Sequence, residues 1–245
     1  MYQRYIDYVE SVVNRNDTSN FKSNAIYQDI LEHVSQELGQ QYYRTLTSIH
    51  NIDKSIIEKF CLENDRIGSP IKYLIGDLSF PVSPTSLRYL DHAMHTLNHI
   101  KTLKLETVNI VEIGCGYGGF LLALNYMSKL HGIVINSYSC IDIDAITKLQ
   151  QLYISNYVVS FPVTFHSASS FGETVKNDNL FLVSMYCFSE IEPVNQRGYI
   201  DHIMKRISNG ILMWNHCDVF DFGKTILSIQ DERPLTGHNN KLVLF

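Results

Sequence analysis

The sequence predicts an α/β protein in which a helical N-terminal region precedes a mostly parallel β-sheet. From Val108 onward, short apolar runs alternate with amphipathic stretches, a pattern typical of the βαβ units of a parallel sheet. Before Leu105, apolar residues recur at intervals of three and four, which is the spacing of helices. Together these observations predict a Rossmann-like, seven-strand sheet with an antiparallel last strand. We expect the helical region to cover residues 1–105 and the sheet domain residues 106–245.

The N-terminal region is expected to begin with helices, because apolar residues recur at helical spacing within 5–13 and 26–34. Glycine and three prolines then rule out a long helix between residues 67 and 84, so an extended connector is expected there. Ser83-Pro84-Thr85 starts the next helix, since a capping serine precedes a proline that suits the first helical turn.

The polar face of this next helix carries a stripe of four residues: Arg88, His92, His95 and His99. We expect the stripe to be solvated or to form one wall of a ligand pocket. Its histidines have the spacing of metal ligands on one helix face. No acidic or cysteine residue sits at a matching spacing, so the sequence predicts no metal site.

The sheet domain contains a regular succession of predicted elements. Strands are expected at about 108–113, 137–142, 162–166, 180–184, 210–214, 225–230 and 240–245, and helices at about 119–130, 145–155 and 194–207. The last two strands are joined by residues 232–240, a segment too short for a crossover helix. These two strands should therefore form an antiparallel pair.

Composition and charge exclude several kinds of partner. The chain has 245 residues, a formal net charge of −5 and a pI near 6.0. Binding to nucleic acid or to an anionic membrane needs a clustered basic surface, so neither partner is expected. The N-terminus lacks the apolar core of a signal peptide and the cysteines are scattered singly, which predicts a cytoplasmic protein with buried, reduced thiols. The tyrosine-rich helices before Pro70 are the expected pairing surface of a homodimer.

The most informative segment, Val108–Phe120, is an apolar strand that ends in an acidic residue and leads into a glycine-rich turn and a helix. Glycines let the backbone turn sharply and approach a ligand closely. The turn lacks the GxGxxG spacing of a dinucleotide site and has Glu112 two residues before its first glycine. A carboxylate at this position suits a cationic ligand such as S-adenosylmethionine and would repel a pyrophosphate. The residues expected to bind this cofactor are Glu112, Gly114, Cys115, Gly116, Tyr117 and Gly118.

The next predicted strand also ends in an acidic residue, Asp142. A carboxylate at the end of the second strand can accept hydrogen bonds from the ribose hydroxyls of a nucleoside ligand. We expect Asp142 and its neighbour Ile143 to bind the cofactor in this way. Asp144 is expected either to cap the helix that begins at Ala145 or to contact the ligand.

The segment from Glu112 to Gly119, together with Asp142, resembles the cofactor site of class I S-adenosylmethionine-dependent methyltransferases. Further segments resemble the sugar O-methyltransferase family: residues 67–70 with 83–89, residues 188–190, and residues 232–237 with Asn239. The resemblance covers about residues 60–245 and implies an enzyme that transfers a methyl group to a hydroxyl of a sugar or nucleotide-sugar. The chain departs from this family at Phe120, where a polar residue usually continues the glycine loop.

Ligands of an open α/β sheet bind beyond the carboxyl ends of its strands, so the ends of the first, second, fourth and fifth strands should face one cleft. Methyl transfer to a hydroxyl needs a base that removes its proton. The candidate catalytic residues are Glu190, which aromatic neighbours should partly bury, and His216, because histidine titrates near neutrality unaided. The alternatives are a helix-terminal charge for Glu190 and an exposed loop position for His216.

The expected acceptor-binding residues are Arg88, Tyr89, His92, Tyr186, Asn215 and Arg233. Arg233 and Thr236 should either reach the cleft or hold the terminal hairpin in place. Two other functions stay open: methylation of a different small-molecule hydroxyl, and a catalytically silent relative whose helical half mediates interactions. A turn without a ligand would have no need of Gly114, Gly116 and Gly118 together, which favours the enzyme.

Overall fold

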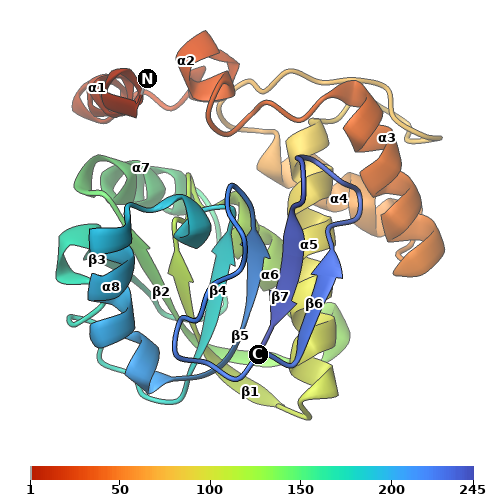
Figure 1. Cartoon of the computed structure of the whole chain (residues 1–245). Helices are drawn as coiled ribbons and strands as arrows, with labels where there is room; N and C mark the ends of the chain where they lie inside the picture. Colours follow the sequence, from red (N-terminus) through yellow and green to blue (C-terminus); the bar gives the residue numbers. More distant parts are fainter. Residues whose placement is uncertain (1) are drawn as a thin grey trace. The chain divides into compact units, whose positions relative to one another are not determined.

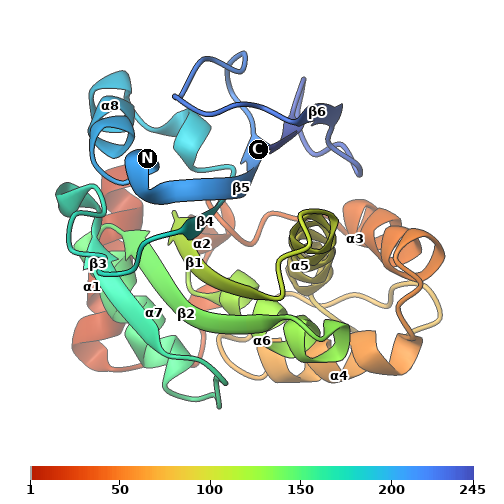
Figure 2. The ribbon, with the colours of Figure 1, turned by 90° about the horizontal axis from the view of Figure 1, so that it is seen from below.

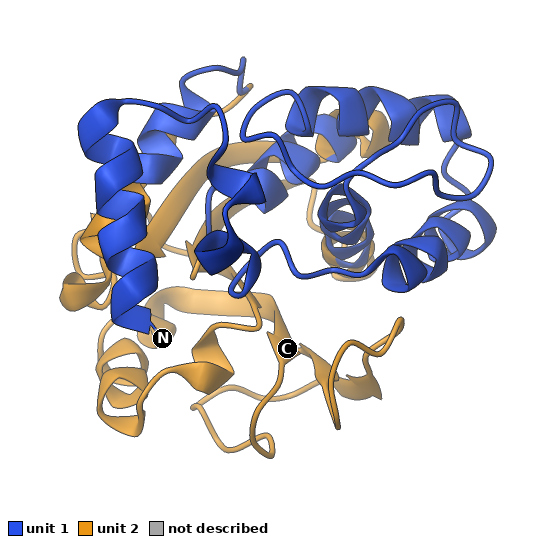
Figure 3. Ribbon diagram, turned by 90° about the horizontal axis from the view of Figure 1, so that it is seen from above, with its two compact units in different colours: residues 1–95, 116–127, 148–159 blue, residues 96–115, 128–147, 160–245 orange. Residues whose placement is uncertain are grey.

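The computed structural model describes residues 2–245 and divides into two compact units, neither of which is a single run of sequence. Unit 1 holds the residues up to 95 together with 116–127 and 148–159, and unit 2 holds residues 96–115, 128–147 and 160–245 (Figure 3). Three helices contribute to both units: α5 (Pro84–Thr102), α6 (Gly119–His131) and α7 (Asp144–Ile154). The expected division of the chain between residues 105 and 106 stays a prediction.

Unit 2 contains the sheet, whose strands are β1 (Thr107–Ile113), β2 (Val134–Asp142), β3 (Val163–Ser167), β4 (Leu180–Met185), β5 (Ile207–Trp214), β6 (Ser228–Asp231) and β7 (Lys241–Leu244). Hydrogen bonds join them in the order β3-β2-β1-β4-β5-β7-β6 (Figure 1). The neighbouring strands β3, β2, β1, β4 and β5 pair in parallel, whereas β7 runs antiparallel to both β5 and β6. The predicted fold class, a Rossmann-like seven-strand sheet with an antiparallel last strand, is confirmed.

Packing in unit 2 explains why the central strands are rich in apolar residues. Residues Leu180–Val183 of β4 are all buried, as expected for an interior parallel strand. One face of the sheet packs against α8 (Pro193–Asp201) through a cluster that includes Leu182, Tyr199 and Trp214 (Figure 2). Short 3-10 turns complete the unit: η3 (Ala168–Ser170), η4 (Phe188–Glu190) and η5 (Met204–Arg206).

Unit 1 is helical, as the spacing of its apolar residues predicts. Its further elements are α1 (Tyr2–Arg15), the 3-10 turn η1 (Phe21–Ser23), α2 (Ala25–Gln28), α3 (Gln36–Arg44), the π-helix η2 (Thr45–Ile49) and α4 (Lys54–Asn64). Side chains cap three of these helices: Asn24, Ser35 and Asp53 each accept a hydrogen bond from a backbone nitrogen of the first turn.

Helix α5 begins at Pro84, as expected, but its polar stripe is not solvated. Arg88 is 5% exposed, His92 1% and His99 5%, so the expectation of a solvated face is wrong. The polar groups find partners inside the protein instead. Arg88 donates to the Leu31 carbonyl oxygen over 2.9 Å, and a ring nitrogen of His99 lies 3.2 Å from the Phe245 carbonyl oxygen. The periodicity of a helix does not show that distant residues will satisfy its polar face.

Among residues 2–245, no helix combines the length and the apolar character that crossing a bilayer requires. The five cysteines are free thiols. Cys61, Cys115 and Cys140 are buried as expected, whereas Cys217 is exposed, because it lies in the loop after β5.

Candidate functional site

The carboxyl ends of β1, β2, β4 and β5 lie next to one another along one edge of the sheet in unit 2. Gly114, which follows β1, donates its backbone N–H to the Ile141 carbonyl oxygen of β2 over 3.0 Å. Tyr186, which follows β4, donates its backbone N–H to the Met213 carbonyl oxygen of β5 over 2.9 Å. Ligands of open α/β sheets bind at this edge, so the candidate site begins here.

Glu112 places a carboxyl group inside the protein, directly before this edge. Its side chain is buried, and Tyr138 donates its phenol hydrogen to Oε2 over 2.6 Å. Burial, and to a smaller extent the nearby Asp142 carboxylate, raise the pKa of Glu112 to about 8, while the Tyr138 hydrogen bond opposes the rise. At neutral pH the carboxyl group is therefore mostly protonated, and a cation bound next to it would favour loss of the proton.

The glycines of the turn all have positive φ angles, which are 78° at Gly114, 53° at Gly116 and 96° at Gly118. In unit 2, a Cβ on Gly114 would lie 2.3 Å from Cβ and Sγ of Cys187. In unit 1, a Cβ on Gly118 would lie 3.0 Å from the Ile154 side chain. Packing and backbone angle therefore account for glycine at positions 114 and 118 without a ligand, so these two glycines do not by themselves indicate one.

Cys115 and Tyr117, the other expected cofactor residues of the turn, bury their side chains. The Cys115 thiol donates to the Glu112 carbonyl oxygen over 3.3 Å, and the Tyr117 ring packs edge-on against Tyr89 within unit 1. Glu112, Cys115 and Cys140 are close enough together to hold a metal ion, but burial raises the pKa of both thiols. Protonated thiols are poor metal ligands.

Asp142 ends β2 and is half-buried. Its Oδ1 accepts a hydrogen bond from the Ile143 backbone N–H over 2.9 Å, which holds the carboxylate at the sheet edge. Asp144 is exposed and is the first residue of α7, so this helix begins one residue earlier than predicted. In the first helical turn the negative charge of Asp144 interacts favourably with the positive end of the helix dipole.

Ser189 and Asn215 link the ends of β4 and β5 beside the candidate bases. Ser189 Oγ donates to Asn215 Oδ1 over 2.6 Å, and the Asn215 backbone N–H donates to Ser189 Oγ over 3.0 Å. Asn215 Nδ2 also donates to a Glu190 carboxylate oxygen.

Glu190 is exposed, so its expected partial burial is wrong. Phe188 turns into the core and leaves Glu190 at the surface. His216 follows Asn215, is exposed and has a φ of 70°.

Glu232 organises the terminal hairpin, a role that sequence reasoning missed. Its buried carboxylate accepts hydrogen bonds from the Thr236 backbone N–H over 2.9 Å, from Thr236 Oγ1 over 2.8 Å and from Asn240 Nδ2 over 2.9 Å. The Tyr186 hydroxyl donates to it as well. Thr236 therefore holds the hairpin in place, the second of its two expected roles, and Arg233 is exposed beside Glu232.

The expected acceptor residues of α5 lie in unit 1. Arg88, Tyr89 and His92 are all buried, and the His92 ring meets the Tyr42 ring edge-on at a centroid distance of 6.3 Å. These side chains take part in the packing of unit 1, and their role in acceptor binding stays a prediction.

Comparison with known proteins finds likeness in structure alone, since no family model and no curated protein matches the chain. The mitomycin 7-O-methyltransferase MmcR is 10% identical, with a TM-score of 0.43 over 66% of this chain and 56% of MmcR. A mutant of MtNAS in complex with S-adenosylmethionine is 14% identical, with a TM-score of 0.42 over 98% of this chain and 96% of that one. A candidate class I S-adenosylmethionine-dependent methyltransferase from Listeria monocytogenes is 15% identical, with a TM-score of 0.48 over 98% of this chain and 86% of that one.

These likenesses are weak. The chain spans little more than half the length of MmcR, and the three TM-scores are 0.48 or lower. The fold assignment therefore rests on the strand order of the sheet itself.

Proposed function

We propose that this protein is an S-adenosylmethionine-dependent O-methyltransferase that methylates a hydroxyl of a sugar or nucleotide-sugar. The observation that carries the proposal is the pair of carboxyl groups on the neighbouring strands β1 and β2, Glu112 and Asp142. Burial is the main cause of the raised pKa of Glu112, and the Asp142 charge adds to it. A cationic ligand next to both groups would relieve their repulsion, whereas a dinucleotide phosphate would add to it. S-adenosylmethionine carries positive charge on its sulfonium and amino groups.

The residues at the sheet edge fit the polar parts of this cofactor. Asp142 can accept hydrogen bonds from both ribose hydroxyls, and Glu112 can balance the amino group. The backbone of residues 114–118, bent by positive φ angles, can approach the ligand closely. The bound cofactor would supply an electrophilic methyl group. The protein's own residues then have to align the acceptor hydroxyl and remove its proton.

Glu190 and His216 are the proposed bases. Both follow strands whose carboxyl ends belong to the candidate edge, and Asn215 orients Glu190 through a hydrogen bond. Replacing the acting base, by Glu190→Gln or His216→Gln, should lower kcat about 100- to 10,000-fold while cofactor binding is retained.

The acceptor class is supported by the family resemblance of residues 67–70, 83–89 and 232–237. A small polar acceptor also agrees with the net charge of −5, which does not favour a nucleic acid. We include Arg88, Tyr89, His92, Tyr186, Asn215 and Arg233 in the proposal as acceptor-binding residues.

Calorimetric titration of the full chain with S-adenosylhomocysteine tests the proposal. One equivalent should bind, and Asp142→Ala should weaken binding about tenfold or more because charge-assisted hydrogen bonds to the ribose are lost. Titrations at pH 7 in buffers of different ionisation enthalpy count released protons. A pKa of about 8 leaves Glu112 about 90% protonated at pH 7, so binding of the ligand amino group should release up to about 0.9 proton.

Glu112→Gln is the matched control, because the amide keeps the shape of the side chain but has no proton to release. Proton release should disappear in this variant. Absence of binding by the folded wild-type chain would overturn the proposal. Binding without methyl transfer to any member of a panel of sugars and nucleotide-sugars would contradict the acceptor class.

A further inference from the structure

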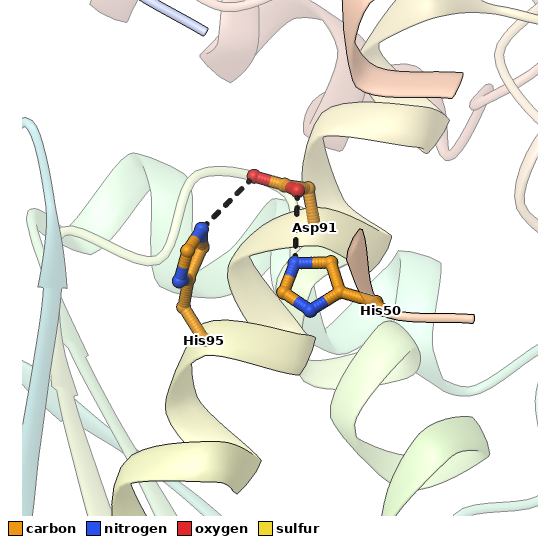
Figure 4. Close-up of side chains that lie close together, drawn as sticks. All are labelled: His50, Asp91 and His95. Carbon is orange, nitrogen blue, oxygen red and sulfur yellow. Dashed lines mark ion pairs between the residues drawn. The ribbon is translucent and has the colours of Figure 1, made fainter. Parts of the chain in front are cut away.

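Unit 1 contains a cluster of two histidines and an aspartate that the proposed methyl transfer does not use. His50 follows η2, and Asp91 and His95 lie one turn apart on α5. Figure 4 shows both imidazole rings beside the Asp91 carboxylate. Asp91 Oδ1 lies 3.3 Å from His50 Nε2, and Asp91 Oδ2 lies 3.6 Å from His95 Nε2. One donor atom from each of the three residues lies within 4.8 Å of the other two.

These separations are close to those between two ligands of one metal ion. Zn²⁺ binds histidine nitrogen and carboxylate oxygen at about 2.0–2.1 Å with tetrahedral geometry, so neighbouring ligand atoms lie about 3.3–3.4 Å apart. The Asp91 oxygens and the two imidazole nitrogens are separated by 3.3 and 3.6 Å. Small side-chain rotations would bring all three residues onto one ion.

Burial leaves the Asp91 carboxylate in need of a cation. The side chains are 1% exposed for Asp91, 4% for His50 and 27% for His95. Within the part of the chain that the structure describes, Asp91 Oδ1 receives no hydrogen bond, although His50 Nε2 is close to it. A buried carboxylate is costly unless positive charge or hydrogen bonds compensate it. A divalent cation would supply this charge and would accept the lone pairs of the imidazoles.

The backbone around the cluster holds its donors in place. The His50 backbone N–H donates to the Thr45 carbonyl oxygen over 3.0 Å, which closes the π-helix η2, and π-turns occur frequently at functional sites. Asp91 and His95 are four residues apart on a helix, so they share one face. An ion bound here would join two segments that are distant in sequence.

From this geometry we propose that His50, Asp91 and His95 bind a zinc ion. Three protein ligands leave a fourth tetrahedral position, which a water molecule or a ligand atom can occupy from the side of His95, the most exposed of the three. The ion cross-links the segment after η2 to α5 within unit 1.

Metal titration of the full-length protein tests the site. The protein is treated with a chelator and titrated with Zn²⁺ by calorimetry, and with Co²⁺, whose visible absorption reports tetrahedral coordination. One Zn²⁺ should bind per chain. His95→Gln, at the partly exposed position, should weaken zinc binding by about 100-fold or more, since even the loss of a group that only orients a ligand costs 10- to 100-fold. Asp91→Asn should do the same, and circular dichroism checks that each variant is folded.

His238→Gln is the matched control, because His238 is an exposed histidine of the terminal hairpin, and it should bind zinc like the wild type. Zinc binding that survives His95→Gln would overturn the proposal. So would binding that is lost in Cys140→Ala, because the ion would then belong to the cluster of Glu112, Cys115 and Cys140. Failure of the folded wild-type chain to bind either metal would also overturn it.

Discussion

Gly114 is constrained both by its backbone angle and by its neighbour Cys187. Gly114→Ala should destabilise the protein by about 2–5 kcal/mol, because a left-handed backbone costs an L-residue about 1–2 kcal/mol and overpacking adds about 1–3 kcal/mol. Gly132→Ala is the control, since Gly132 has a φ of 68° but open space around its Cβ position, and it should cost only about 1–2 kcal/mol. Chemical denaturation measures both. If both variants lose the same stability, the Cys187 side chain moves aside without a measurable free-energy penalty, and the overpacking argument is contradicted.

Glu112 should make stability fall as pH rises. Its pKa is about 8 in the folded protein against an ordinary value of 4.5, so the folded state holds a proton that the unfolded state releases between these values. This contribution is fully present below pH 4.5 and is lost by about pH 8, a change of about 5 kcal/mol. Glu112→Gln should therefore gain stability relative to the wild type as pH rises from 5 to 8. Denaturation curves of both proteins between pH 5 and 8 check this prediction. A difference in unfolding free energy between them that does not vary with pH would contradict it.

At the candidate site, residue types were easier to predict from sequence than side-chain environments. The strand pattern placed Glu112 and Asp142 correctly at neighbouring strands, because the order of strand, acid, glycine turn and helix is local. It misjudged Glu190, whose exposure depends on which way Phe188 turns. It also overlooked Glu232, because the hydrogen bonds of this carboxylate come from residues that only the folded hairpin brings together.

Lys22 joins several elements of unit 1 at one buried amino group. It donates to the Asn64 carbonyl oxygen at the end of α4 over 2.7 Å and to the Tyr153 hydroxyl on α7 over 3.1 Å. The amine also lies 4.2 Å from the centroid of the Tyr117 ring, which is a cation–π contact. Burial lowers the pKa of Lys22 to about 8, and the nearby Glu32 carboxylate opposes the fall. The amine therefore stays mostly charged at neutral pH.

Lys22→Met should destabilise the protein by about 3–5 kcal/mol at pH 7, because it removes the cation that most strongly favours the charged forms of the Glu32 and Asp65 carboxyl groups. Lys59→Met is the control: Lys59 is an exposed lysine of α4, and its replacement should change stability by less than about 0.5 kcal/mol. Urea denaturation compares the two variants. A loss in Lys22→Met as small as that of the control would show that the buried charge is dispensable.

The first strand was predicted more closely than the last helix. The first strand, expected at 108–113, is found at Thr107–Ile113, because a buried parallel strand is a short apolar run that can be recognised locally. The helix expected at 194–207 instead stops at Asp201, and Ile207 pairs with Leu180 of β4. Pairing between strands overrides local helix periodicity at this point.

The grouping of the whole chain into units was beyond sequence patterns. Residues 116–127 follow β1 closely in sequence, yet they belong to unit 1 with residues 2–95 and 148–159. In this unit Tyr117 packs against Tyr89 and Tyr153. Hydrophobic spacing reports only on neighbours a few positions apart, so it cannot show such contacts. Sequence reasoning also overlooked Asp91, which lies one turn before His95 on the same helix, and it gave no sign that His50 would join them.

Binding of S-adenosylmethionine at the ends of β1 and β2 is tested most directly by photochemical cross-linking of the full chain to methyl-labelled cofactor, followed by peptide mapping. The label should fall on peptides that contain residues 112–118 or 138–143, and excess S-adenosylhomocysteine should prevent labelling. Label confined to other peptides, or label that excess S-adenosylhomocysteine does not reduce, would contradict binding at these strand ends.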